Sequence, residues 1–128
     1  MIDVYRVGVR DRVSCAHYIK GLTGSKCSQL HGHNYTVEVV VEGDFLREGS
    51  VLIDASAVKS RLRDILKDYD HRVLNDILQT PDASAETLAL AIAERMSRAL
   101  SDCGVRLRCV RVWETPDVWV EVTLDEGQ

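Results

Sequence analysis

The segment HNYTVEVVVE, residues 33–42, gives the clearest strand signal in the chain and decides how the rest is interpreted. Its odd positions are His, Tyr, Val, Val and Val, and its even positions are Asn, Thr, Glu, Val and Glu. A period of two is typical of a strand that buries one of its faces. The sequence therefore predicts a strand in which His33 points to the same side as the apolar residues.

A second alternating segment precedes it. From residue 5 to residue 17 the odd positions are Tyr, Val, Val, Asp, Val, Cys and His, so the apolar set is interrupted once, at Asp11. Between the two segments, residues 18–30 contain Gly21 and Gly24 and show no sustained period, which is typical of a loop. We therefore expect two strands that pair antiparallel through this loop.

Two helices are predicted next, each with a capping residue and one apolar stripe. Asp54 precedes the first and Ser84 the second, and Gly104 is placed to end the second. Apolar side chains recur at helical spacing in both segments. In the first helix the stripe is Val58, Leu62, Ile65, Leu66 and Tyr69, and in the second it is Ala85, Leu88, Ala89, Ile92, Met96 and Leu100.

Two further strands, residues 105–114 and 118–124, are joined by the turn-forming residues Thr-Pro-Asp at 115–117. The order predicts an α+β fold (ββααββ), with a four-stranded antiparallel sheet and both helices on one face. The other face would expose Arg6, Arg10 and Arg12, and the sheet would have two open edges. Association into a closed ring of sheets would cover both features, so we expect an oligomer.

Composition limits the class of protein. The 128 residues, of which 45% are hydrophobic, are expected to form a single domain over residues 1–128. A net charge of −4 with scattered arginines argues against a nucleic-acid partner, and we find neither an export signal nor an apolar run long enough to span a membrane. Without a basic footprint for nucleic acid, we expect a small-molecule partner. Four cysteines without a CxxC pair favour a reduced, cytoplasmic setting.

Three of the four histidines are predicted to meet at one place. Residues two apart in a strand share a side, so His31 and His33 project together, and His17 at the end of the first strand would lie beside them. Three imidazoles and an open fourth position describe a catalytic zinc site. Two alternatives stay open: the histidines are ordinary polar residues, or Cys27 is a fourth ligand and the site is structural.

Five motifs together resemble one known family. They are CAH (15–17), CSQLHGHNY (27–35), DHRVLN (70–75), ASAETLA (83–89) and WET (113–115). In this order they resemble the 6-pyruvoyltetrahydropterin synthase family over nearly the whole chain. The CxxxHGH spacing is more similar to the 6-carboxytetrahydropterin synthase branch than to the biopterin-pathway branch.

The resemblance implies a tunnelling fold whose subunits close into a barrel, giving a trimer-based homo-oligomer, a hexamer. It also implies a reaction in which 7,8-dihydroneopterin triphosphate becomes 6-carboxy-5,6,7,8-tetrahydropterin, with release of acetaldehyde and triphosphate, in the queuosine and archaeosine precursor pathway. The implied roles are zinc binding by His17, His31 and His33, proton abstraction by Cys27, a partner dyad of Asp70 and His71, and pterin binding by Glu114.

One segment departs from the family pattern. Where the family has a Pro-Thr pair and then Glu-Asn, this chain has Ala83-Ser84 and Glu86-Thr87, although Ser84 keeps a hydroxyl for the substrate. Two other functions also fit the sequence. One is a 6-pyruvoyltetrahydropterin synthase acting on the same substrate, and the other is a non-catalytic binding module clamped by zinc.

Overall fold

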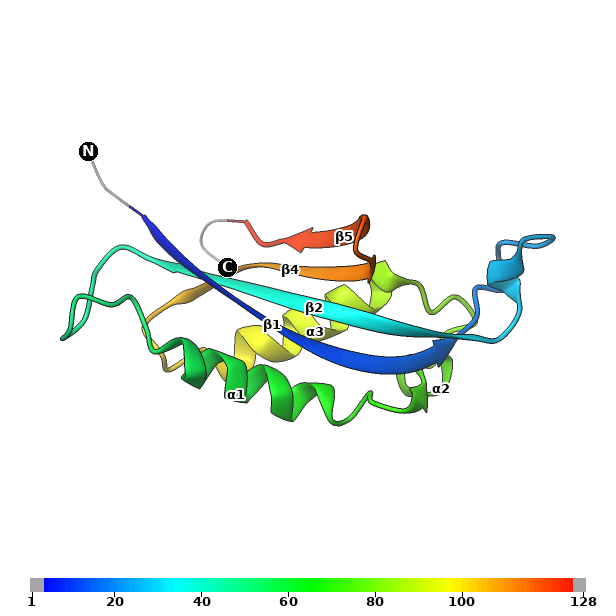
Figure 1. The fold of residues 1–128 in the computed structure, drawn as a ribbon, viewed down its shortest axis with the longest axis horizontal. Coiled ribbons are helices and arrows are strands. Elements are labelled where there is room, and N and C mark those ends of the chain that lie inside the picture. The colour runs from blue at the N-terminus through cyan, green and yellow to red at the C-terminus, as the bar shows by residue number, and fades with distance from the viewer. Residues whose placement is uncertain (1–3, 126–128) are drawn as a thin grey trace.

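The computed structural model describes residues 4–125, and its centre is a five-stranded sheet with strand order β3-β1-β2-β4-β5 (Figure 1). The elements in chain order are β1 (Tyr5–His17), η1 (Lys26–Ser28), β2 (His31–Gly43), α1 (Ala55–Leu66), β3 (Arg72–Val73), α2 (Leu74–Leu78), α3 (Ala85–Ala99), β4 (Arg106–Thr115) and β5 (Val118–Thr123).

The two long strands form the antiparallel pair that their alternation predicts. Tyr5 lies opposite Gly43 at one end and His17 lies opposite His31 at the other. Odd-numbered residues of both strands face the core, where Val13 and Tyr35 are buried. The predicted interruption at Asp11 also faces this side, because its carboxylate accepts a hydrogen bond of 3.1 Å from Arg63 of α1.

Both long helices cover the face of the sheet that carries these odd-numbered residues (Figure 1). α1 packs against β1, and α3 packs against β4, β5 and α1. Asp54 and Ser84 cap the helices as predicted, each accepting a hydrogen bond from a backbone N–H of the first turn. Both predicted apolar stripes are buried, so helical spacing alone located the core.

The predicted four-stranded, two-helix arrangement is incomplete in two places. A short strand, β3, pairs parallel to β1 at Cys15 and Ala16, which makes the sheet five-stranded and mixed. A third helix, α2, follows it and ends at Gln79, which has a left-handed backbone. Elements of two and five residues are too short for a periodic pattern to develop, so neither can be recognised from periodicity.

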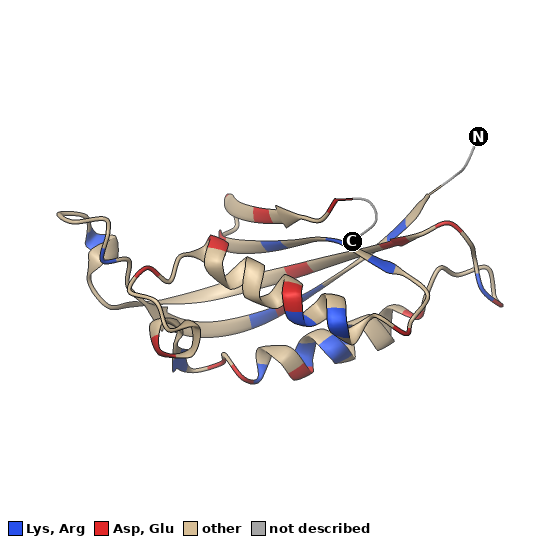
Figure 2. Cartoon of the chain, turned by 180° about the vertical axis from the view of Figure 1, so that it is seen from behind, with Lys and Arg blue, Asp and Glu red and all other residues tan. Residues whose placement is uncertain are grey.

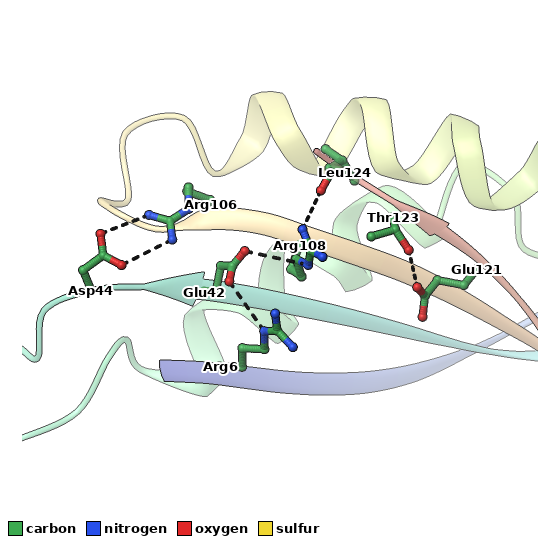
Figure 3. A network of polar contacts seen from close by, with 8 residues as sticks. All are labelled: Arg6, Glu42, Asp44, Arg106, Arg108, Glu121, Thr123 and Leu124. Carbon is green, nitrogen blue, oxygen red and sulfur yellow. Dashed lines mark hydrogen bonds and ion pairs between the residues drawn. The ribbon is translucent and has the colours of Figure 1, made fainter. Parts of the chain in front are cut away.

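The face that the helices leave open is lined by ion pairs. Glu38 accepts from Arg10 at 2.6 Å and from Arg111 at 3.0 Å, and Arg111 also donates to Glu121 at 2.6 Å, so charges alternate across four strands. Glu42 forms a similar contact with Arg6 and Arg108 further along (Figure 3). The predicted arginine row is therefore largely paired with buried carboxylates.

Basic and acidic residues are interspersed along the helices and the strands (Figure 2). Such mixing differs from the basic face that nucleic-acid binding requires. Over residues 4–125, no helix is long and apolar enough to cross a membrane.

Candidate metal centre and active site

Three histidines converge at the end of β1 and β2, as predicted. His17 and His31 are opposed in the strand register, and His33 lies two residues further along β2 on the same side. The ring centroids are 4.5 Å apart for His17 and His31, 5.1 Å for His17 and His33, and 5.0 Å for His31 and His33. One ligand atom from each ring lies within 4.8 Å of the other two.

Backbone carbonyls fix the orientation of two of these rings. His17 Nδ1 lies 2.6 Å from the carbonyl oxygen of Ala83, and His31 Nδ1 lies 2.7 Å from that of Gln29. A carbonyl can only accept, so Nδ1 carries the proton in both rings and Nε2 keeps its lone pair. Carbonyl-anchored imidazoles of this kind are typical of metal ligands.

The donor set fits a zinc ion with one open position. Three neutral imidazole nitrogens are the protein ligands of many catalytic zinc sites. Within residues 4–125, the cluster that could hold a metal contains His17, His31 and His33 and no fourth group. The Cys27 sulfur lies outside this cluster, which argues against the structural site that Cys27 would have closed.

Tyr35 is a residue of the site that the sequence did not identify. It is fully buried, its ring stacks on His33 with centroids 5.2 Å apart, and its hydroxyl oxygen lies 3.1 Å from His17 Nε2. The sequence signal was available, because Tyr35 follows His31 and His33 at the next same-side position of the strand. It was assigned to the core because an aromatic residue at that spacing usually belongs there.

The causes of the raised pKa of Tyr35 identify charged groups near this side chain. Burial raises this pKa most, and the remaining increase comes from the negative charges of Glu114, Cys15, Cys27 and Glu86. The predicted residues Cys27 and Glu114 therefore lie within electrostatic reach of Tyr35. Glu86, in the first turn of α3, is a further acidic neighbour that the sequence did not single out.

Cys27 lies in η1, just before the histidine pair. Its backbone N–H donates to Ser25 Oγ at 3.1 Å, and its carbonyl accepts from the Ile19 N–H at 2.7 Å, which ties both ends of the loop together. Cys15 is buried, whereas Cys27 is partly exposed. Burial first, and then the charge of Asp70, raises the pKa of Cys15 to about 12. Cys27 is therefore the better candidate for a reactive thiol.

Asp70 and His71 form a dyad at the edge of β1. The His71 Nδ1 lies 2.8 Å from an Asp70 carboxylate oxygen, and the other oxygen accepts the Ser14 N–H at 2.9 Å. His71 has φ of 58°, a left-handed conformation that is costly for a residue with a side chain. The His71 imidazole is largely exposed.

His71 faces a cavity on the side of the sheet that the helices leave open. The cavity, of about 350 Å³, is lined by His71 with Ser14, Ala16, Gly32 and Asn34, and also by His33 of the triad. The even-numbered residues among them face the side of β1 and β2 that the helices leave open, whereas the triad projects from the opposite side. Of the predicted site residues, the three histidines meet in one cluster, and Cys27 and Glu114 lie within electrostatic reach of Tyr35 beside it. His71 faces the open side of the sheet and shares with the triad only the cavity that His33 also lines.

Ser84 lies beside the triad but has a structural partner already. Its hydroxyl oxygen accepts the Thr87 N–H at 3.2 Å as the cap of α3, and the neighbouring Ala83 carbonyl is the one that anchors His17. The start of α3 thus holds the metal site in place. A substrate contact from Ser84 would use the hydroxyl proton, which the cap does not consume.

Asp70 allows a test of the dyad's contribution to stability. Hydrogen bonds, first from the Ser14 N–H and then from His71, hold the pKa of Asp70 below its usual value of 3.8. This contribution is therefore present above pH 3.8 and is lost as the pH falls through the lower folded-state pKa. In urea unfolding, wild type should exceed Asp70→Asn in stability at pH 7, and the gap should narrow at about pH 3. A larger difference in stability between wild type and Asp70→Asn in acid than at pH 7 would contradict this.

Comparisons with known proteins agree with this geometry. The family described as 6-pyruvoyl tetrahydropterin synthase matches residues 6–125. A dihydroneopterin monophosphate aldolase from Pyrococcus furiosus is 34% identical over 117 residues, covering 91% of this chain and 96% of the relative. A 6-carboxy-5,6,7,8-tetrahydropterin synthase from Bacillus subtilis is 31% identical over 112 residues, covering 81% of this chain and 75% of the relative.

A solved structure confirms the predicted fold. The 6-pyruvoyl tetrahydropterin synthase of Caenorhabditis elegans superimposes with a TM-score of 0.83 at 23% identity, covering 97% of this chain and 98% of that one. At this level of identity the likeness establishes the tunnelling fold, and function has to be argued from the site.

Proposed function

Because this chain belongs to the 6-pyruvoyl tetrahydropterin synthase family, we propose that it converts 7,8-dihydroneopterin triphosphate and one water molecule to 6-carboxy-5,6,7,8-tetrahydropterin, acetaldehyde and triphosphate. The observation that carries the proposal is the cluster of His17, His31 and His33, with the Cys27 thiol outside it. The relative from Bacillus subtilis bears the name of this activity. The reaction would place the protein in queuosine or archaeosine precursor synthesis, in the cytoplasm.

The histidine triad would hold a zinc ion through the three nitrogens that the structure brings together. A zinc ion bound there supplies Lewis-acid chemistry, which acidifies the bonds next to the substrate's side-chain hydroxyls. Ala83 and Gln29 keep two of the rings oriented through their carbonyls, so the site is preorganised. Glu114 would hold the pterin by accepting hydrogen bonds from the N–H groups of the ring.

Cys27 would act as the base. Its thiolate takes a proton from the substrate's side chain, and the electron pair left on carbon assists the departure of triphosphate. A cation held by the neighbouring histidines would favour the thiolate form. Outside the metal cluster, the sulfur keeps its lone pairs for this proton transfer.

Asp70 and His71 would complete the site from a second subunit. Within one chain they face the open side of the sheet, so a substrate at the triad would meet the dyad of a neighbouring copy. Asp70 orients the His71 ring through Nδ1, which leaves Nε2 free to carry protons to and from the substrate. Such a site requires a homo-oligomer, in keeping with a hexamer of stacked trimers that close their sheets into barrels.

Complementation between inactive variants tests the shared site. Cys27→Ala and His71→Ala are each expected to be inactive, and co-refolding them in equal amounts should restore about a quarter of the wild-type rate, the fraction of sites with both residues intact. The assay is turnover of the triphosphate substrate. Mixtures as inactive as their components would place both residues in one chain's site.

Product analysis tests the reaction itself. Zinc-loaded protein incubated with 7,8-dihydroneopterin triphosphate should release acetaldehyde and triphosphate in equal amounts, with 6-carboxy-5,6,7,8-tetrahydropterin as the pterin product. Accumulation of 6-pyruvoyltetrahydropterin without acetaldehyde would assign the chain to the activity that gives the family its name.

A second candidate comes from the relative in Pyrococcus furiosus. That protein is named a dihydroneopterin monophosphate aldolase and is 34% identical over almost the whole of both chains. An aldolase would use the same metal and base to cleave a carbon–carbon bond next to a hydroxyl. Assays of one protein preparation with dihydroneopterin monophosphate and with the triphosphate distinguish the two activities. We expect turnover of the triphosphate alone.

A further inference from the structure

The hydroxyl of Tyr35 lies over the face of the His17 ring, close to the nitrogen that would bind a metal. It lies 3.1 Å from His17 Nε2 and 3.3 Å from His17 Nδ1. An oxygen nearly equidistant from both ring nitrogens lies off the ring plane, so the hydroxyl does not occupy the in-plane lone pair of Nε2. Nδ1 gives its proton to the Ala83 carbonyl, so a metal ion on the triad would use the Nε2 lone pair and leave the tyrosine hydroxyl beside it.

Among residues 4–125, the Tyr35 hydroxyl contacts no hydrogen-bond acceptor apart from the His17 ring. Tyr35 is fully buried. The ring is fixed by stacking on His33 and by its edge-on contact with His17, so the side chain is held at the triad. A buried hydroxyl without a partner is destabilising, and a ligand bound at the metal centre would be the group able to accept its proton.

We propose that Tyr35 is a positioning residue whose buried hydroxyl, held over the His17 ring, donates a hydrogen bond to an oxygen atom of the ligand bound at the metal centre. The centre thereby prefers oxygen ligands, such as the hydroxyls of a diol side chain, over ligands that bind through nitrogen. This inference rests on the metal centre proposed above. It adds a selectivity that the three histidines alone would not provide.

Cobalt(II) in place of zinc gives a spectroscopic test that needs no turnover. Wild type and Tyr35→Phe are loaded with Co²⁺, and visible absorption is followed during titration with acetohydroxamate, an oxygen ligand, or imidazole, a nitrogen ligand. The loss of one hydrogen bond predicts acetohydroxamate binding about tenfold weaker in Tyr35→Phe. Imidazole affinity should be equal in the two proteins. Tyr69→Phe, which removes a hydroxyl from another largely buried tyrosine, should match wild type with both ligands.

Each other outcome contradicts the inference in a recognisable way. Equal acetohydroxamate affinities would show that the hydroxyl makes no contact with the ligand, and equal losses for both ligands would show a general change in the centre. Failure of Tyr35→Phe alone to bind Co²⁺ would make Tyr35 a structural support for the triad. Failure of wild type to bind Co²⁺ would overturn the metal centre itself, and this inference with it.

Discussion

Replacing Cys27 with alanine is expected to lower the rate of substrate turnover by roughly 10²–10⁴ while leaving zinc content unchanged, because a positioned base contributes a factor of that size. The metal should stay because the sulfur lies outside the cluster of His17, His31 and His33. Little loss of stability is expected, since Cys27 lies in a short surface turn and only its backbone makes hydrogen bonds. Turnover and zinc content are measured on the same preparation.

The matched control is Cys103→Ala, which removes another partly buried thiol at a distance from the histidines. It should retain both zinc and activity. If Cys27→Ala lost its zinc together with its activity, Cys27 would be a ligand, and the site would be the zinc-clamped module that the sequence left open.

Replacing His31 with alanine is expected to abolish turnover and to weaken zinc binding by at least about 100-fold. Loss of a group that only hydrogen-bonds to a metal ligand typically costs 10–100-fold in metal affinity, so loss of a ligand itself should cost more. His31 is the most informative of the three histidines because, unlike the buried His17, it can be removed without opening a hole in the core. Competition with a chromophoric chelator measures the affinity.

His71→Ala is the matched control for this second prediction. It also removes one imidazole, but from the dyad on the other side of the sheet, and it should retain wild-type zinc affinity while losing activity. If the two variants bound zinc equally well, the triad would not be the metal site. If His71→Ala alone lost zinc, the metal would have to lie at the dyad.

Much of the fold followed from periodicity, because the long elements each bury one face. The alternation in residues 33–42 placed β2 and the side on which His33 projects, and helical spacing placed α1 and α3. β3 and α2 were missed because they are held by tertiary contacts: β3 by two residues of β1, and α2 by its packing against β1 and α3. A pattern confined to two or five residues carries too little information.

The site was predictable to the extent that strand register determines it. His17, His31 and His33 share one side of a paired β1 and β2, so convergence required only the correct pairing. At its position in the strand alternation, Tyr35 could be either a core residue or a residue of the site. Only the distance between its hydroxyl and His17 shows that it belongs to the site. The place of Asp70 and His71 on the opposite side depends on how the chain returns to the edge of β1, which no local pattern records.

The central claim is that three imidazoles bind one zinc ion and leave it an open position for substrate oxygen. X-ray absorption spectroscopy of the zinc-loaded, substrate-free protein tests this most directly. We predict a first shell of three nitrogens and one oxygen at roughly 2.0–2.1 Å, with no sulfur. A zinc–sulfur distance near 2.3 Å would contradict the account, because Cys27 would then fill the open position and could not serve as the base.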